Sequence, residues 1–200
     1  INLVENKEDV LRQIYNSLKF GGEFFFSDVY ADRRIPERLT KNSLLYNECL
    51  GGALYYRDFE RVARKIGFVD PRIISKRAIN VTNDEVKSLI GNIAFYSITY
   101  RLCKITGLED ACEDYGHIAI YKGGIAESPF KFELDGSHVF AKNKAVRVCS
   151  NTALMLLSTR FKKYFQVIGS FDEHFGSYKS SGNEETKDDT DSEKNVQSCC

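Results

Sequence analysis

The sequence lacks the features that mark membrane proteins and polyanion-binding proteins. Its 200 residues contain no run of 18 or more apolar residues, so no segment is predicted to span a membrane. Basic and acidic residues each number 28, and the resulting net charge of zero favours neither nucleic acid nor an anionic membrane as a partner. A secretory signal pattern is also missing from the start. These absences predict a cytoplasmic protein.

Motifs for structural metals and for histidine-based catalysis are absent too. Cys103 and Cys112 are nine positions apart, which fits no common zinc motif, and the chain has no CxxC pair. The three histidines, His117, His138 and His174, have neither triad nor metal-ligand spacing. Six cysteines in 200 residues are too sparse for a disulfide-stapled domain. We therefore expect free thiols in a reducing compartment and no metal site of the usual kinds.

Hydrophobic periodicity predicts an α/β fold. Apolar residues at helical spacing predict a helix over 6–19, and the apolar run Glu23–Tyr30 predicts a strand that is buried on both faces. The later patterns predict helices over 36–48 and 58–67, the second with Asp58 as N-cap and Gly67 at its end. A capping box at Thr82–Glu85 predicts a further helix that ends near Gly91. Strands are predicted over 71–79, 95–102 and 117–122.

A change in pattern follows Gly123-Gly124, which we take as a domain boundary. Strand-like runs at Phe130–Leu134 and Ala145–Cys149, with a turn at Asp135-Gly136, predict a small antiparallel unit before a helix over 153–157. From about Ser177 the chain is polar and acidic and is predicted to be disordered. The predicted domains are therefore 1–122, 123–176 and a tail, 177–200.

The most informative segment is Glu48-Cys49-Leu50-Gly51-Gly52-Ala53-Leu54-Tyr55-Tyr56. Two glycines after the cysteine let the backbone bend tightly and let a ligand approach the thiol. This segment resembles the arsenic-binding signature of arsenite methyltransferases, which use S-adenosylmethionine, except that Tyr56 replaces a tryptophan. The resemblance extends over about residues 1–176, through Leu18-Lys19-Phe20-Gly21-Gly22 before a strand (Phe20 replacing the usual proline), Gly91-Asn92, Phe95–Arg101 and Gly123.

The resemblance implies the C-terminal part of a Rossmann-like class I methyltransferase sheet, a small α+β domain and a disordered tail. Class I enzymes hold their cofactor with a glycine-rich loop after the first strand, and this sequence has no such loop. We therefore expect a fragment that lacks most of the cofactor pocket and is inactive alone. Half a sheet would leave the edge of the strand at 24–29 unpaired, which predicts poor solubility.

The resemblance places two catalytic, arsenic-binding thiols at Cys49 and Cys149. Trivalent arsenic is soft and selects thiolates by the logic that governs soft metals. Cys149 precedes Ser150-Asn151-Thr152 and an apolar helix, and a helix N-terminus lowers a thiol pKa, so Cys149 should be more thiolate-like than Cys103. Asp28 ends the buried strand, where open α/β sheets bind ligands, and is a candidate to line the cofactor or substrate mouth.

Structural interpretations of these residues stay open. Any one cysteine can be a small buried hydrophobe, and Cys103 and Cys112 have no ligand role in the family pattern. The vicinal pair Cys199-Cys200 could capture soft metals or exchange thiols, or have no essential role. No metal site is predicted beyond the arsenic ligands.

The implied activity is methyl transfer from S-adenosylmethionine to thiol-bound trivalent arsenic, a detoxification reaction carried out by the full-length parent. The expected partners are arsenite and methylated arsenicals as thiol adducts, with glutathione or thioredoxin as thiol reductant, and the expected state is a monomer. Two alternatives remain. One is a thiol-based module that binds arsenic(III) or other soft ions without catalysis. The other is a small-molecule O- or C-methyltransferase, which would not need both thiols.

Overall fold

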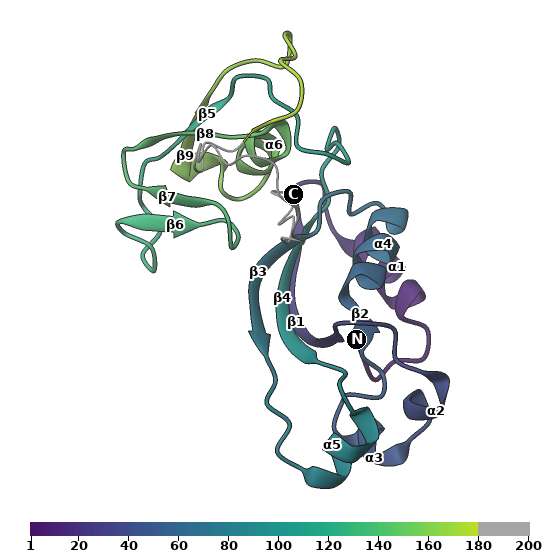
Figure 1. Ribbon diagram of the computed structural model, residues 1–200. Coiled ribbons are helices and arrows are strands. Elements are labelled where there is room, and N and C mark those ends of the chain that lie inside the picture. The colour runs from purple at the N-terminus through teal and green to yellow at the C-terminus, as the bar shows by residue number, and fades with distance from the viewer. Residues whose placement is uncertain (180–200) are drawn as a thin grey trace, which may run out of the picture. The chain divides into compact units, whose positions relative to one another are not determined.

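The computed structural model describes residues 1–179, which divide into two compact units (Figure 1). Unit 1 comprises residues 1–106 together with 133–138, and unit 2 comprises 107–132 and the residues from 139 on. The chain thus passes from unit 1 to unit 2 at 106/107 and returns to unit 1 for residues 133–138. The predicted domain boundary was Gly123-Gly124. Most of the tail predicted to be disordered, and with it Cys199-Cys200, lies outside the described residues.

Unit 1 is built on a mixed four-stranded sheet. Its strands are β1 (Glu23–Ala31), β2 (Leu54–Tyr55), β3 (Arg72–Ala78) and β4 (Phe95–Cys103), in the order β2-β1-β4-β3. Strand β4 runs antiparallel to both β1 and β3, while β2 runs parallel to β1. This arrangement confirms the predicted α/β fold. The two-residue strand β2 was not predicted, because it is too short to show a period.

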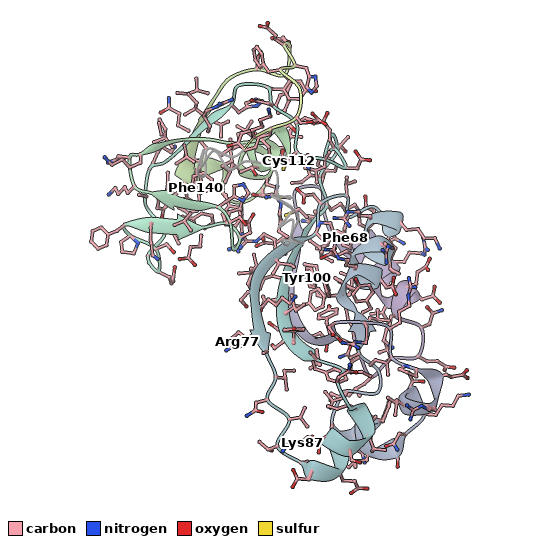
Figure 2. All side chains as sticks on the ribbon, viewed as in Figure 1. Phe68, Arg77, Lys87, Tyr100, Cys112 and Phe140 are labelled. Carbon is pink, nitrogen blue, oxygen red and sulfur yellow. The ribbon has the colours of Figure 1, made fainter. Side chains whose placement is uncertain are left out.

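Helices α1 (Lys7–Ser17) and α4 (Tyr56–Ile66) cover one face of this sheet (Figure 1). Their apolar sides meet the sheet in a core with large aromatic members, among them Phe59 on α4, Tyr100 on β4 and Phe68 just after α4 (Figure 2). Helix α4 ends at Gly67, as predicted, in a conformation with φ +127° where an added Cβ would lie 2.7 Å from the Tyr15 ring.

Three predicted helix starts in unit 1 were wrong in detail. The helix expected over 36–48 is two short helices, α2 (Glu37–Thr40) and α3 (Ser43–Asn47), because the Asn42 side chain accepts a hydrogen bond from Leu45 N and starts a new helix. Helix α4 begins at Tyr56, so Asp58 lies in its first turn and is not the N-cap. Helix α5 (Asp84–Ile90) is capped by Asn83, one residue after the expected Thr82.

One edge of β1 is largely unpaired within residues 1–179. On one side β1 pairs with β4 along its whole length, but on the other side β2 meets it only at Tyr30 and Ala31. The edge from Phe24 to Val29 therefore faces no strand in the described part of the chain, which confirms the predicted open edge. Phe25, halfway along it, is 50% exposed.

Unit 2 contains a second sheet that the sequence pattern assigned to the wrong place. Strand β5 (Ile118–Tyr121) lies inside the predicted first domain, 1–122, but it pairs with β8 (Ala145–Arg147) and β9 (Phe165–Ile168), both antiparallel. The prediction was wrong because alternating burial along β5 is the same in either sheet. The partner depends on residues far away in the chain.

The remaining elements of unit 2 surround this sheet. Strand β6 (Lys131–Glu133) pairs with the unpredicted β7 (Val139–Ala141), helix α6 spans Ser150–Ser158 and a 3₁₀ turn, η1, spans Lys162–Tyr164. Aromatic side chains form its core, including Phe140, labelled in Figure 2, and Phe165, whose rings are 5.2 Å apart. No helix among residues 1–179 has the length and apolar character needed to cross a bilayer.

Candidate functional site

Cys49 lies in the loop that ends helix α3. After the last helical residue and Glu48, the N–H of Cys49 donates to Tyr46 O (3.0 Å) and the N–H of Leu50 donates to Leu45 O (2.9 Å). These two bonds, together with packing of Leu45 and Leu50 in one buried cluster, define a Schellman motif. Cys49 occupies the position of that motif that usually holds glycine.

The backbone of Cys49 has the left-handed conformation that this position requires. Its φ is +60°, and among the described residues only Asn143 shares a positive φ without being glycine. For a residue with a Cβ this conformation costs roughly 1–2 kcal/mol. Glycine at this position would be free of this backbone strain, so the turn by itself does not account for the cysteine. The Cys49 side chain is a free, partly exposed thiol.

The two glycines after Cys49 allow close backbone contacts. A Cβ on Gly52 would lie 2.1 Å from Asn2 O, and a Cβ on Gly51 would lie 3.1 Å from Tyr46 N. The glycines are therefore required by the approach of neighbouring backbone. The predicted tight bend is confirmed, and the approach of a ligand to the thiol stays a prediction.

A pocket of about 550 Å³ lies next to this loop in unit 1. Charges of both signs line it. Lys7 and Arg34 are basic, Glu5 and Asp58 are acidic, and the side chains of Arg34 and Asp58 pair at 2.6 Å. Burial lowers the pKa of Lys7, and the nearby charge of Asp28 partly offsets this effect. The lining comprises Asn2, Leu3, Val4, Glu5, Lys7, Arg34, Ile35, Thr40, Tyr46, Gly51, Gly52, Ala53, Leu54, Tyr55 and Asp58.

Asp28 binds the backbone of Asn2. Its Oδ2 accepts from Asn2 N (3.0 Å), while its Oδ1 accepts from Val29 N (2.8 Å). Asp28 is near the carboxyl end of β1, as expected, but it is not among the residues that line the pocket. The structure thus gives Asp28 an anchoring contact, and its predicted place at a cofactor mouth stays a prediction.

Cys149 is the N-cap of helix α6 in unit 2 and is completely buried. The helix starts directly after it, so the predicted position beside a helix N-terminus is confirmed. Ser150, Asn151 and Thr152 form the first turn. The Cys149 sulfur lies 3.3 Å from the Cys112 sulfur and 3.3 Å from Thr152 Oγ1. This sulfur pair was not expected, since Cys112 had no assigned role.

The other candidate residues have structural surroundings. Burial raises the pKa of Cys103 on β4 to about 12, with the charge of Glu23 adding to the effect. His138 Nδ1 lies 2.8 Å from Asp135, and His174 Nε2 lies 3.1 Å from Glu113. Buried His117 has no hydrogen-bond partner at either ring nitrogen within the described part of the chain. Residues 1–179 hold no cluster of three or more His, Cys, Asp or Glu side chains suited to a metal ion.

Sequence reasoning missed Asn2, which the structure places between β1 and the Cys49 loop. Its side-chain Nδ2 donates to Val29 O at 2.7 Å and lies 3.5 Å from Cys49 O. The signal was available, because an asparagine inside the apolar run Ile1-Asn2-Leu3-Val4 predicts a buried amide that must find hydrogen-bond partners.

Comparison with known proteins gives consistent matches. Residues 115–200 match the family described as "Arsenite methyltransferase C-terminal domain". Arsenite methyltransferases from Aquipseudomonas alcaligenes and Rattus norvegicus are 49% identical over 91% of this chain and 40% identical over 82%. The chain covers 53% and 44% of these relatives, so it spans about half their length.

A solved structure shows the same relationship in three dimensions. The crystal structure of an arsenic(III) S-adenosylmethionine methyltransferase from Chlamydomonas reinhardtii matches with a TM-score of 0.86 and 44% identity, covering 89% of this chain and 60% of that one. These matches agree with the resemblance that the Cys49 segment first indicated: over most of its length, the chain is similar to the C-terminal portion of arsenite methyltransferases.

Proposed function

We propose that this chain is the part of an arsenite methyltransferase that presents a thiol to trivalent arsenic, and that Cys49 is that thiol. The observation that carries the proposal is the strained, partly exposed Cys49 in the Schellman position, in a loop whose Gly51 and Gly52, but not Cys49 itself, line a pocket of about 550 Å³. A soft trivalent centre selects sulfur over nitrogen or oxygen, which matches a site built around a cysteine. The relatives named as arsenite methyltransferases give the substrate class.

The whole protein would transfer a methyl group from S-adenosylmethionine to the bound arsenic. We propose that the residues of this chain do not form a cofactor site by themselves, because the sequence has no glycine-rich loop after a strand. This chain supplies the thiol that binds arsenic and part of the pocket lining.

Cys149 remains our proposed second thiol, with separate support. Cys149 caps the start of α6, and its sulfur lies 3.3 Å from the sulfur of Cys112, which is itself disulfide-bonded. Because Cys149 is fully buried, unit 2 would have to open locally before the thiol could bind. Cys49 and Cys149 belong to different units, and their convergence on one ion stays a prediction.

The finer parts of the proposal follow from the resemblance. We propose that arsenite and methylated arsenicals arrive as thiol adducts, that glutathione or thioredoxin regenerates the site, and that the protein acts as a cytoplasmic monomer without nucleic-acid or membrane partners. The net charge of zero agrees with the choice of partners. The cysteines do not decide the compartment, because Cys49, Cys103 and Cys149 are free thiols and Cys112 is disulfide-bonded.

Arsenite binding tests the ligand assignment directly. The 200-residue chain, with Cys199 and Cys200 replaced by serine to remove the vicinal pair, is incubated with arsenite, and bound arsenic is measured after gel filtration. We expect C49S to lose most binding and the control C103S to retain it. Loss in C149S as well would support two shared thiols, whereas full binding by C149S would remove it from the site. Unchanged binding by C49S would refute the proposal.

A binding module without catalysis is the second candidate, favoured by the missing glycine-rich loop. The two functions separate in a full-length arsenite methyltransferase that contains this chain. Methylated products that disappear in C49S would support the enzyme. Arsenite binding without any methylated product would support the module.

A further inference from the structure

The Cys49 loop needs a restraint beyond its own helix, because the Schellman hydrogen bonds position the backbone of residues 49–51 relative to α3 only. Helix α3 has five residues and is too short to be stable alone. The direction of the thiol therefore depends on what ties this helix and loop to the sheet.

Asn2 provides that tie. Its amide Nδ2 donates to Val29 O near the end of β1 (2.7 Å) and lies 3.5 Å from Cys49 O, so one carboxamide bridges the strand and the loop. Its backbone N–H donates to Asp28 Oδ2 (3.0 Å), which holds Asn2 itself against β1. Asn2 is only 5% exposed, and a buried amide with these partners has little freedom to move.

The backbone of Asn2 lies so close to the loop that no side chain fits between them at Gly52. An added Cβ at Gly52 would lie 2.1 Å from Asn2 O and 3.0 Å from its carbonyl carbon. The next residue adds a second tie, since Tyr46 on α3 donates its hydroxyl to Leu3 O (3.2 Å). The segment around Asn2 thus contacts residues on both sides of Cys49: Leu3 O accepts from the Tyr46 side chain, and the Asn2 backbone lies against the Gly52 backbone.

We propose that Asn2 is a positioning residue for Cys49: its carboxamide fixes the left-handed turn against β1 and so sets the direction of the thiol beside the pocket. This inference rests on the proposed arsenic-binding role of Cys49. Asn2 itself needs no contact with the arsenic. Removing the amide would leave Val29 O and Cys49 O without this donor and free the loop to rotate.

The test compares N2A and N2D with N42A in the full 200-residue chain carrying C199S and C200S. Asn42 is a matched control because it caps the same short helix without contacting the Cys49 loop, so its loss destabilises α3 by about 1 kcal/mol. Arsenite affinity and the thermal midpoint are measured for each variant. We expect both Asn2 variants to weaken arsenite binding about tenfold, equivalent to about 1.4 kcal/mol, and N42A to change it less than twofold at a similar loss of midpoint.

A second readout separates failure of this inference from failure of the arsenic assignment. The pH–rate profile of iodoacetamide alkylation at Cys49, followed by peptide mass spectrometry, does not depend on arsenic. If the wild-type chain binds no arsenite through Cys49, the proposed function fails. The Asn2 inference is then supported if the alkylation rate at Cys49 changes about tenfold in N2A and N2D but not in N42A. Equal effects of the Asn2 and Asn42 variants on affinity, or on this rate where arsenite does not bind, would overturn it. N2D retains the size of the side chain and serves if N2A does not fold.

Discussion

Cys49 and Cys149 lie at opposite ends of helices, and they differ in their accessibility to solvent. Cys49 follows the C-terminus of α3 and is partly exposed, whereas Cys149 precedes the N-terminus of α6 and is fully buried. The accessible cysteine therefore lies at a helix C-terminus, and the cysteine at a helix N-terminus is inaccessible in the folded chain.

The two units also differ in the polar and charged residues that they bury. Unit 1 buries ion pairs, with Arg72 between Asp70 (2.7 Å) and Asp135 (2.9 Å), and buried Arg101 paired with Glu23 and donating to Leu134 O. In unit 2 the residues at the start of α6, beside Cys149, are the neutral Ser150, Asn151 and Thr152, although buried Asp114 pairs with Arg147 (2.6 Å) in the same unit. The buried ion pairs make the stability of unit 1 sensitive to pH.

The largest expected difference is in native-state alkylation. At pH 8, iodoacetamide should modify Cys49 on the order of a hundredfold faster than Cys149, because Cys149 reacts only after local opening. Cys103, whose pKa burial raises to about 12, should be as slow as Cys149 or slower. Peptide mass spectrometry at timed quenches measures all three rates in one sample. Equal rates at Cys49 and Cys149 would contradict the contrast between them.

Alanine at two glycines compares the packing of the two units. In G52A the new Cβ overlaps Asn2 O, and we expect a loss of about 3 kcal/mol in the free energy of unfolding, the upper end for overpacking. In G107A, in unit 2, the only neighbour is Leu154 Cδ1 at 3.7 Å, so only the strain of φ +84° remains, about 1 kcal/mol. Urea unfolding measures both. A larger loss in G107A would show that the Asn2 contact does not constrain the loop.

Acid should weaken unit 1 more than unit 2. Burial alone would raise the pKa of Asp135, but the hydrogen bond from His138 and the charge of Arg72 outweigh it and lower this pKa to about 2. A carboxyl group with a lowered folded-state pKa stabilises above its unfolded value, near 3.9, and this stability is lost as the pH falls toward 2. The expected loss is about 2 kcal/mol.

Hydrogen exchange at pH 5 and pH 2.5 checks this expectation, after correction for intrinsic rates. Amides of β3 and β4 should lose more protection than those of β5 and β9. D135N is the control, because it cannot titrate and should show a smaller change between the two pH values. An identical change in D135N would mean that other carboxylates dominate the acid response.

Elements with strong local signals were predictable. Helix α1, strand β1, and the end of α4 at Gly67 follow from apolar periodicity and from the need for a positive φ. Errors arose where the signal was short or shared. Asn42 and Asn83 compete with neighbouring polar residues for the cap position, and the alternating pattern of β5 suits either sheet.

The candidate site was predictable only in part. The segment around Cys49 identified the residue, but its Schellman geometry depends on Leu45 and Leu50 meeting in a core that is also built from distant residues. The bridge through Asn2 joins residues 27 and 47 positions apart, and the contact between Cys112 and Cys149 spans 37. Pairings at such separations leave no local pattern.

By itself the sequence determined the α/β character, most helices and strands, and a cysteine followed by two glycines as the place for soft-ion chemistry, because all of these depend on neighbours within a few positions. Only the tertiary structure decided which sheet β5 joins, which thiol is accessible and which is buried, and how Asn2 holds the Cys49 loop. These outcomes depend on contacts between distant segments, whose free energies compete only once the chain has folded.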